Sequence, residues 1–327
     1  MRVLLLGATG TIGQATVKAL VQAGHEVVCL VRDKSGGDGT GNTTAMQMSL
    51  KGAEIHFGDV LDTHSVLAEK WLQQPFDALV SCLASRNGTP RDAWAIDYQA
   101  HSAWLQLAKT KGIKQFVLLS ALCVQKPLLE FQRAKLAFEN ELVASGLNYS
   151  IVRPTAFFKS LSGQIKRLKQ GKPFLLFGDG QLTACKPISD QDLGQFIANC
   201  LTDNHLHRAV LPIGGPGPAI TPLQQAQILF KLMGLPPRYK HVPVGFLDMV
   251  IVVLKTLGRL IPVLSDKAEL AKIGRYYATE SMLVWDPQKS AYDEHATPSF
   301  GSQTLHAHYE HMLQNRIDVD LGQHSVF

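Results

Sequence analysis

Six short apolar runs punctuate the first half of the chain, and segments with helical spacing of apolar residues separate most of them. The runs cover residues 2–6, 26–31, 53–57, 78–83, 116–120 and 148–152. Unbroken apolar runs of this length are typical of strands that are buried on both faces of a sheet. Strands that alternate with helices predict an α/β fold with a doubly wound (Rossmann) parallel sheet and right-handed crossovers.

The second half of the chain loses this alternation. A helix is predicted over 221–233, because Thr-Pro is a start signal and Gly234 is a stop signal. No further strand–helix repeat follows it. We therefore expect residues 1–160 to form the Rossmann domain, with its sheet completed by parts of 183–215. Residues 161–327 should form mainly a smaller lobe that covers the substrate.

The most apolar segment of this second half covers residues 246–264. Asp248, Lys255 and Arg259 interrupt it, and Pro262 ends it. A membrane-spanning helix needs about 20 predominantly apolar residues, so we expect no crossing. Two interpretations stay open, namely peripheral contact with a membrane surface and a wall that covers an apolar ligand.

A glycine-rich turn directly follows the first apolar run and precedes a helical stripe. Such a turn lets the backbone approach a ligand, and the helix N-terminus offers free N–H groups to a phosphate. The spacing is G-x-x-G-x-x-G, and we interpret it as a dinucleotide-binding turn; the alternative is a tight turn without a nucleotide. The cofactor-binding residues assigned here are Gly7, Thr9, Gly10, Thr11, Ile12 and Gly13.

The end of the second run indicates which dinucleotide binds. Arg32 stands about 20 residues after the last glycine, where an acid would hold the ribose of NAD and an arginine accommodates the 2′-phosphate of NADP. A planar guanidinium can bind phosphate through two hydrogen bonds. With Asp33 and Lys34 beside it, the alternative is a solvated charge cluster. We favour NADPH as the cofactor.

Residues after the other strands are expected to complete the site, because ligands bind outside the C-terminal ends of strands in an open α/β sheet. Asp59 and Val60 follow the third run near the expected adenine, although Asp59 could instead cap the next helix. Further cofactor contacts are expected from Cys82, Leu83, Ala84, Ser120, Pro154 and Thr155. Substrate contacts are expected from Phe157, Phe158 and Lys159, although paired phenylalanines are also common in cores.

Composition narrows the class of protein. A chain of 327 residues with 46% hydrophobic and 18% charged residues can bury a large core. The net charge of +5 and the lack of a recognised nucleic-acid-binding motif argue against a nucleic-acid partner. The five cysteines are widely spaced and form no C-x-x-C, which favours free thiols in the cytoplasm. Because the first predicted strand begins at Arg2, we expect no signal or transit peptide.

The twelve histidines predict no metal site in the protein. Most are scattered along the chain, and the only groups are His205 with His207 and a cluster over 306–311. Neither group has a cysteine nearby or matches a zinc motif. We expect surface histidines.

A frame typical of short-chain dehydrogenases follows the fifth run, with one change. That family carries a serine at the end of this strand and Y-x-x-x-K on the next helix, where the lysine lowers the pKa of the tyrosine and holds the ribose. Ser120 and Lys135 keep the frame, but the tyrosine position is Phe131, which cannot donate a proton. Carbonyl reduction through that residue is therefore excluded. Lys135 is a candidate ribose ligand; the alternative is an exposed helix lysine.

Long segments of the chain resemble the NADPH-dependent divinyl chlorophyllide 8-vinyl reductases, a family of atypical extended short-chain dehydrogenases in the NmrA-like superfamily. The similar segments are 80–88, 116–135, 150–161, 186–188, 213–217 and 272–282. The resemblance extends over nearly the whole chain and is more specific than the glycine turn alone.

The resemblance implies reduction of the 8-vinyl group of divinyl chlorophyllide or protochlorophyllide to ethyl in (bacterio)chlorophyll biosynthesis. No carbonyl oxygen reacts, so Phe131 is compatible with this chemistry and is expected to contact the substrate. Hydride transfer to the terminal vinyl carbon would leave a carbanion that the conjugated ring delocalises. Candidate proton donors are Lys135, Tyr98 and Cys123, besides water. Cys82 and Cys123 are alternatively small buried apolar residues. Any Mg²⁺ would belong to the substrate.

Other classes of protein stay open on the sequence. One is a non-catalytic NADP-binding sensor or assembly factor, and another is a different tyrosine-less NADPH-dependent C=C reductase. Loss of the tyrosine argues against a nucleotide-sugar epimerase. For the vinyl reductase we expect a bacterial form in the cytoplasm, with peripheral contact to a photosynthetic membrane as an open alternative.

Overall fold

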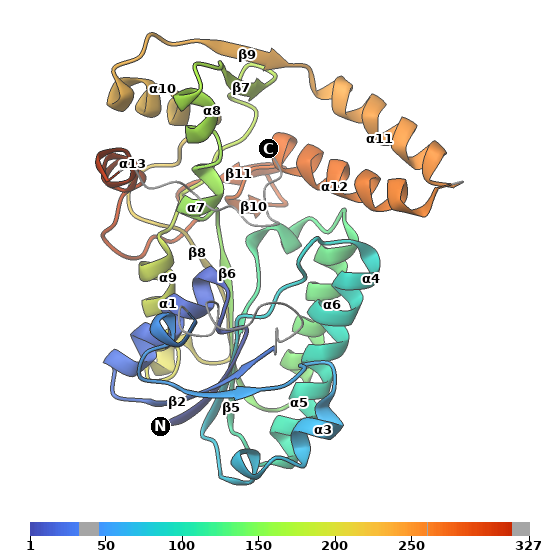
Figure 1. Cartoon of the computed structure of the whole chain (residues 1–327), viewed down its shortest axis with the longest axis vertical. Helices are drawn as coiled ribbons and strands as arrows, with labels where there is room; N and C mark the ends of the chain where they lie inside the picture. Colours follow the sequence, from blue (N-terminus) through green and yellow to red (C-terminus); the bar gives the residue numbers. More distant parts are fainter. Residues whose placement is uncertain (33–45, 260, 316–327) are drawn as a thin grey trace.

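Seven parallel strands form the central sheet of this computed structural model, which describes residues 1–32, 46–259 and 261–315 (Figure 1). The strand order is β3-β2-β1-β4-β5-β6-β8, and every neighbouring pair is parallel. The strands are β1 (Arg2–Leu6), β2 (Glu26–Val31), β3 (Glu54–Phe57), β4 (Ala78–Ser81), β5 (Gln115–Leu119), β6 (Asn148–Pro154) and β8 (Ala209–Ile213). The order reverses between β1 and β4, so a ligand crevice is expected at their carboxyl ends. The predicted doubly wound sheet is confirmed.

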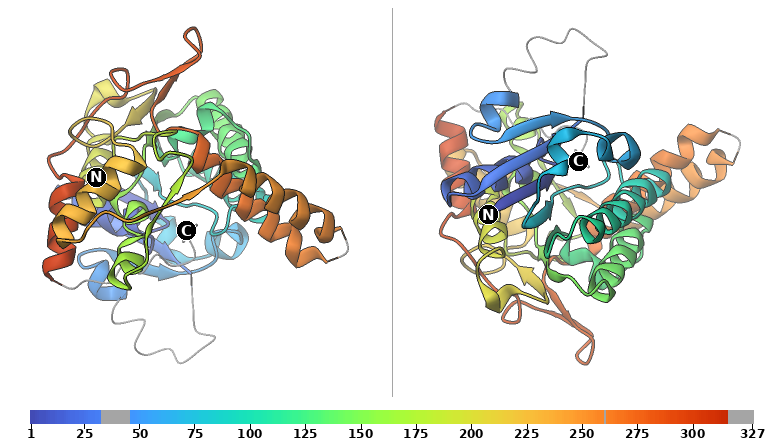
Figure 2. Two further views of the ribbon diagram at one scale, coloured as in Figure 1. Left: turned by 90° about the horizontal axis from the view of Figure 1, so that it is seen from above. Right: turned by 90° about the horizontal axis from the view of Figure 1, so that it is seen from below.

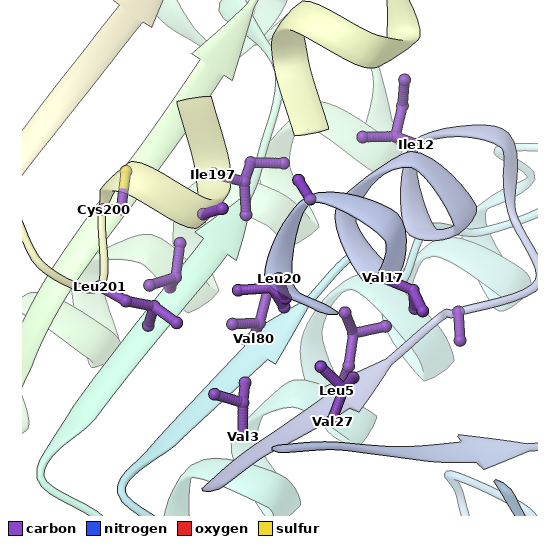
Figure 3. Close-up of a cluster of buried hydrophobic side chains, with 14 of the residues drawn as sticks. Val3, Leu5, Ile12, Val17, Leu20, Val27, Val80, Ile197, Cys200 and Leu201 are labelled. Carbon is purple, nitrogen blue, oxygen red and sulfur yellow. The ribbon is translucent and has the colours of Figure 1, made fainter. Parts of the chain in front are cut away.

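Two helices, α1 (Thr11–Gln22) and α9 (Asp190–Asn199), cover one face of the sheet (Figure 3). Leu20 of α1 and Ile197 of α9 belong to one buried cluster with strand residues such as Val80. A Cβ added at Gly194 would lie 2.6 Å from the backbone carbonyl carbon of Ala15, so the two helices touch through their backbones. This contact holds the start of α1 firmly beside the sheet.

The other face carries the helices α5 (His101–Thr110) and α6 (Glu130–Ala144). Trp104, Phe116 and Phe138 form the large buried side chains of this layer. The short elements on this side of the domain are α3 (Thr63–Leu67), η1 (Lys70–Gln73), α4 (Pro90–Ala93), the π-helical segment η2 (Trp94–Ala100) and η3 (Leu122–Gln125). The π-helical turn is the irregular feature of this layer, and such turns occur often at functional sites.

A second cluster of elements lies beyond the carboxyl ends of the strands (Figure 1). Here β7 (Phe174–Phe177) pairs in parallel with β9 (Tyr239–Val242). The helices around this pair are α7 (Phe158–Leu161), α8 (Ile165–Lys169), α10 (Pro222–Met233) and α13 (Leu305–Gln314). Phe158, Phe174, Leu229 and Tyr309 are buried together in its core. This part of the chain therefore has a hydrophobic core of its own.

A helical hairpin of α11 (Val244–Gly258) and α12 (Pro262–Thr279) projects from the body of the molecule (Figure 2). None of the α11 residues is buried. The short antiparallel pair β10 (Val284–Asp286) and β11 (Ala291–Asp293) follows α12. Within the described residues, no helix combines the length and the apolar character needed to cross a membrane.

Most predicted element boundaries agree with the structure, and two local predictions are wrong. The helix over 221–233 begins with a Thr221 capping box and ends at Gly234 in the left-handed conformation, as predicted. The cap of α3 is Asp62, not Asp59, which instead accepts a hydrogen bond from the Leu61 N–H. The strand predicted over 78–83 ends at Ser81, so the residues after it form a loop. Asp33 and Lys34 lie outside the described residues.

Candidate cofactor and active site

A cavity of about 570 Å³ opens at the carboxyl ends of β1, β4, β5 and β6. Its floor comes from the loops that follow these strands, and α12 contributes Leu270, Ile273 and Tyr277 to the opposite wall. The volume lies within the range of small-molecule sites, and the position is the crevice expected for a ligand in this sheet. This cavity is therefore the candidate site.

The glycine turn forms one end of the cavity. Gly7 has a φ of +79°, and a Cβ there would lie 2.6 Å from the carbonyl oxygen of Cys82. A Cβ at Gly13 would lie 2.1 Å from the Gly7 carbonyl oxygen, so neither position accepts another residue without a shift. Gly10 has no side chain to cap α1, and with Thr11 it lines the cavity. Free N–H groups at this helix start fit a diphosphate.

Two charged side chains add to this end. The Lys159 ammonium donates to the Thr11 hydroxyl at 3.2 Å, which brings a positive charge to the start of α1. Asp190 also lines the cavity, and burial raises the pKa of its carboxyl although nearby Lys159 opposes the shift. One Asp190 oxygen has no hydrogen-bond partner among the described residues. A buried acceptor without a partner is costly, so it fits a hydroxyl of a bound nucleotide.

Lys135 is held on the cavity wall by a buried acid. Its ammonium lies 2.9 Å from Asp97 Oδ1, and the side chains are 11% and 0% exposed. The same oxygen accepts from the Ser85 N–H at 3.2 Å, and Asp97 Oδ2 has no partner among the described residues. Asp97 lies in the π-helical segment η2. The alternative of an exposed helix lysine is therefore wrong, and Lys135 is oriented toward the cavity that it lines.

Phe131 lies one helical turn before Lys135 and also lines the cavity. Its ring and the Ile273 side chain both approach the space beside Gly88, where an added Cβ would lie 3.6 and 2.9 Å from them. The neighbouring Ser120 hydroxyl donates to Glu139, which also accepts from Arg153 at 3.1 Å. Phe131 and Ile273 therefore make the wall beside Lys135 apolar. The proton of the Ser120 hydroxyl is used in a hydrogen bond within the protein.

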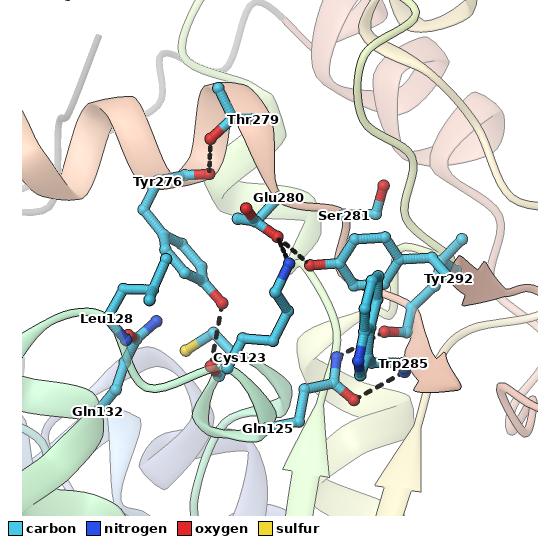
Figure 4. A network of polar contacts seen from close by, with 12 residues as sticks. Cys123, Gln125, Leu128, Gln132, Tyr276, Thr279, Glu280, Ser281, Trp285 and Tyr292 are labelled. Atoms are coloured by element: carbon cyan, nitrogen blue, oxygen red, sulfur yellow. Dashed lines mark hydrogen bonds and ion pairs between the residues drawn. The ribbon is translucent and has the colours of Figure 1, made fainter. Parts of the chain in front are cut away.

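A polar network ties the end of α12 to the loop after β5 (Figure 4). The Tyr276 hydroxyl donates to the Cys123 carbonyl oxygen at 3.0 Å. Lys126 lies 2.5 Å from Glu280, which also accepts from the Tyr292 hydroxyl. The Gln125 side chain bonds the backbone at residues 283 and 285 through both of its polar atoms. These contacts fix the far wall of the cavity against the sheet.

Comparison with known proteins agrees with this geometry. The family model described as NAD(P)H-binding matches residues 7–204. The Cucumis sativus protein named divinyl chlorophyllide a 8-vinyl-reductase, chloroplastic, is 50% identical over 334 residues, which cover 99% of this chain and 79% of that protein. The chain belongs to the divinyl chlorophyllide a 8-vinyl-reductase family. The NAD(P)H-binding match begins at the glycine turn and covers five of the seven sheet strands, β2 to β6, so it includes the turn at this end of the cavity.

Two proteins with lower sequence identity share this fold. Photosystem II assembly factor Ycf39 of Synechocystis sp. is 26% identical to this member of the 8-vinyl-reductase family, over 76% of this chain and 72% of that protein. The solved complex of leucoanthocyanidin reductase with NADPH from Vitis vinifera has a TM-score of 0.66. It covers 96% of this chain and 100% of its own, with 18% identity, and therefore shows the fold alone.

Most of the residues expected to form the site do line the cavity of this 8-vinyl-reductase family member. They are Gly10, Thr11, Ile12, Gly13, Cys82, Leu83, Ala84, Ser120, Cys123, Phe131, Lys135, Pro154, Thr155, Phe157 and Lys159. They come from five separate stretches of the chain, 10–13, 82–84, 120–123, 131–135 and 154–159, which the parallel sheet brings to one edge. Cys82 and Cys123 line it as thiols whose pKa burial raises, to about 12 for Cys82.

Seven expected residues do not line the cavity. They are Gly7, Thr9, Arg32, Asp59, Val60, Tyr98 and Phe158. Phe158 is 2% exposed in the core with Phe174, so its expected substrate contact is wrong. Tyr98 packs edge-on against Trp94 at 5.5 Å, which removes it as a proton donor to the cavity. Arg32 is exposed after the end of β2.

Several residues that line or support the cavity of this 8-vinyl-reductase family member were not predicted from the sequence. Asp97 does not line the cavity but holds Lys135 in place, and no motif in the sequence pointed to this acid. Tyr277 and Glu280 lie within the family-like segment 272–282, but no spacing linked them to a site about 150 residues earlier in the chain. Only the folded chain brings these residues together.

Proposed function

We propose that this protein reduces the 8-vinyl group of divinyl chlorophyllide or protochlorophyllide to ethyl, with NADPH as the reductant, in (bacterio)chlorophyll biosynthesis. The observation that carries the proposal is the pairing of a dinucleotide cradle with Phe131 at the position of the usual phenol. Such a site retains the means to hold a hydride donor but lacks the acid for a carbonyl oxygen. The named relative at 50% identity gives the substrate class.

NADPH supplies a hydride when it is bound, and the residues present fit its parts. The N–H groups of the glycine turn, with Lys159, would hold the diphosphate. Lys135, kept in place by Asp97, would bind the ribose next to the nicotinamide. Arg32 would bind the 2′-phosphate, with Asp59 and Val60 near the adenine. The remaining contacts would come from Cys82, Leu83, Ala84, Ser120, Pro154 and Thr155, with Thr9 at the turn.

The opposite side of the cavity suits a flat apolar ring. Phe131, Phe157, Leu270 and Ile273 give it an apolar lining. A site that holds two flat rings face to face contributes chiefly proximity and orientation, since little reorganisation is then needed for transfer. We therefore propose that residues 161–327 act mainly as the substrate lobe and residues 1–160 as the cofactor domain.

A direct test is the absorption spectrum of the tetrapyrrole. Purified protein, NADPH and divinyl chlorophyllide should give a blue-shifted Soret band, because one vinyl group leaves the conjugated system. Bound NADPH with no shift would contradict the reductase. That result would favour the second candidate, a non-catalytic NADP-binding assembly factor. The observation that favours this candidate is the 26% identity to the assembly factor Ycf39 of Synechocystis sp..

We also propose that the protein acts in the bacterial cytoplasm, on the surface of a membrane with anionic lipids. Helix α11 lines none of the cavity, whereas α12 does, so the apolar residues of α11 are free of the substrate. Phe246, Met249 and Val252 are more than half exposed. Exposed Lys255 lies on the same helix and exposed Arg259 directly follows it, and a helix of this kind fits an anionic bilayer surface.

Vesicle sedimentation tests this contact. The protein should bind phosphatidylglycerol vesicles more strongly than phosphatidylcholine vesicles, and the double variant Phe246→Ser with Met249→Ser should bind several-fold less. Val210→Ser, at an exposed apolar position on β8, is the matched control and should bind like the wild type. Equal binding by all three proteins would contradict the membrane contact.

A further inference from the structure

Two consecutive tyrosines near the end of α12 have different surroundings. Their rings lie 5.6 Å apart at 89°, so the two hydroxyls take different directions. Tyr276 is 4% exposed, does not line the cavity, and gives its proton to the Cys123 carbonyl oxygen. Tyr277 is 37% exposed and lines the cavity. Of this pair, only Tyr277 presents a phenol to a bound ligand.

Tyr277 lines the same cavity as Phe131, which stands at the position of the usual tyrosine and has no hydroxyl. Ile273 lies one turn before Tyr277 on α12 and approaches the same space beside Gly88 as the Phe131 ring. Residues four apart share one face of a helix. Tyr276, buried in one cluster with Phe131 and Ile273, holds this part of α12 in place. The helix α6 has Phe131 where related enzymes carry a tyrosine, and α12 supplies Tyr277 from the opposite wall of the cavity.

Three other polar groups around the ligand space already use their protons inside the protein. Lys135 is paired with Asp97, Lys159 donates to Thr11, and the hydroxyl of Ser120 donates to Glu139. The Tyr277 hydroxyl has a weaker contact, with the Cys123 sulfur at 4.0 Å. Sulfur is a poor acceptor, so the Tyr277 proton is more easily redirected to a ligand than the protons of these three groups.

The protonation state of Tyr277 suits a donor. Loss of water contact around the hydroxyl raises the pKa of Tyr277, and the neighbouring Cys123 thiol adds to the shift. The phenol therefore stays protonated at neutral pH. A carbanion next to an aromatic ring is a much stronger base than a phenolate, so a raised pKa does not prevent the transfer.

Building on the proposed reductase function, we propose that Tyr277 is the proton donor of the vinyl reduction. The hydride from NADPH bonds the terminal vinyl carbon, and the electron pair of the C=C bond moves to the inner carbon and into the ring. The O–H bond of Tyr277 then breaks, and its proton bonds that inner carbon. The phenolate regains a proton from water, so the ethyl group carries one hydrogen from NADPH and one from solvent.

The variant Tyr277→Phe tests this role, with Tyr276→Phe as the matched control. Removal of a positioned acid should lower kcat for divinyl chlorophyllide about 100-fold or more. The dissociation constants of NADPH and of divinyl chlorophyllide, followed by fluorescence titration, should stay within about twofold of the wild type. The solvent deuterium isotope effect on kcat should rise in Tyr277→Phe, because protonation by water becomes limiting. Tyr276→Phe loses the hydrogen bond to the Cys123 carbonyl oxygen but no acid that faces the cavity, so its kcat should fall far less than that of Tyr277→Phe and its isotope effect should stay that of the wild type.

Each other outcome has a definite meaning. Near-normal kcat in Tyr277→Phe, or an equal loss in both variants, would overturn the donor role and leave the reductase function intact. A loss of ligand binding in Tyr277→Phe would assign the residue to packing and also overturn the donor role. A wild-type protein that binds NADPH but never converts divinyl chlorophyllide would overturn the reductase function itself.

Discussion

The two walls of the cavity differ in the sequence separation of the contacts that form them. The cofactor wall consists of short loops that leave the carboxyl ends of parallel strands, and its glycine turn is set by contacts within 13 residues of the N-terminus, together with Cys82. The substrate wall is formed by α12, whose position depends on contacts with residues 123–126, about 150 positions earlier in the chain.

This difference has a chemical counterpart. The cofactor wall contains backbone N–H groups and paired charges, which suit a ligand of fixed shape and charge. The substrate wall is mostly apolar and carries the Tyr277 phenol, which suits a flat ring that must be oriented rather than strongly bound. Changes in the first wall should weaken cofactor binding and stability, whereas changes in the second should affect turnover.

The largest expected effect comes from Asp97 on the cofactor wall. Asp97→Ala leaves the Lys135 ammonium buried without a partner, so the free energy of unfolding should fall by about 4 kcal/mol. Urea denaturation measures this change. The double variant Asp97→Asn with Lys135→Met removes both charges and should recover much of the loss. A double variant as unstable as Asp97→Ala would show that the ion pair does not explain the effect.

Gly13→Ala tests the turn itself. The new Cβ would lie 2.1 Å from the Gly7 carbonyl oxygen, so the turn must shift, at a cost of about 3 kcal/mol in unfolding free energy and with loss of NADPH binding. Gly10→Ala is the control, since its Cβ would lie at an ordinary 3.5 Å from the same oxygen. Equal melting temperatures of the two variants in thermal unfolding would contradict the role of close packing at Gly13.

Arg32→Ala tests which dinucleotide the cofactor wall selects. A lost charge-assisted contact to the 2′-phosphate should weaken NADPH binding by about 2 kcal/mol, and NADH binding should change little. Fluorescence titration with both cofactors gives the ratio of dissociation constants. Equal weakening of both would refute the phosphate role of Arg32.

Gln125→Ala tests the substrate wall and should have the smallest effect. Loss of the two hydrogen bonds to residues 283 and 285 should destabilise the protein by about 1 kcal/mol. Substrate turnover should decline while the NADPH dissociation constant stays unchanged. Weaker NADPH binding in this variant would show that the two walls are coupled.

The sequence is a good guide where contacts are local. The apolar runs and the glycine turn predicted the strands, the start of α1 and the cofactor end of the cavity, because buried parallel strands carry an unbroken apolar pattern. Phe131 and Lys135 were also predictable, since they lie one helical turn apart. Arg32 was recognisable by its distance from the turn, and its phosphate contact stays a prediction.

The sequence is a poor guide where the site depends on distant contacts. Tyr98 was one of three candidate donors that no spacing in the sequence could separate. The π-helical turn directs Asp97 to Lys135 and Tyr98 to Trp94. Phe158 is adjacent to a cavity residue, yet it packs in the core of the other cluster. Tyr277 became visible only when α12 was folded onto the sheet.

Deuterium labelling tests directly whether NADPH transfers a hydride to the vinyl group. Divinyl chlorophyllide is converted with NADPH that carries deuterium at nicotinamide C4, using each of the two stereospecifically labelled forms, and the product is analysed by mass spectrometry and NMR. One form should place a single deuterium in the methyl carbon of the new ethyl group, and its neighbouring carbon should take its hydrogen from solvent. An unchanged vinyl group, or no cofactor deuterium in the product, would contradict hydride transfer to this carbon–carbon double bond.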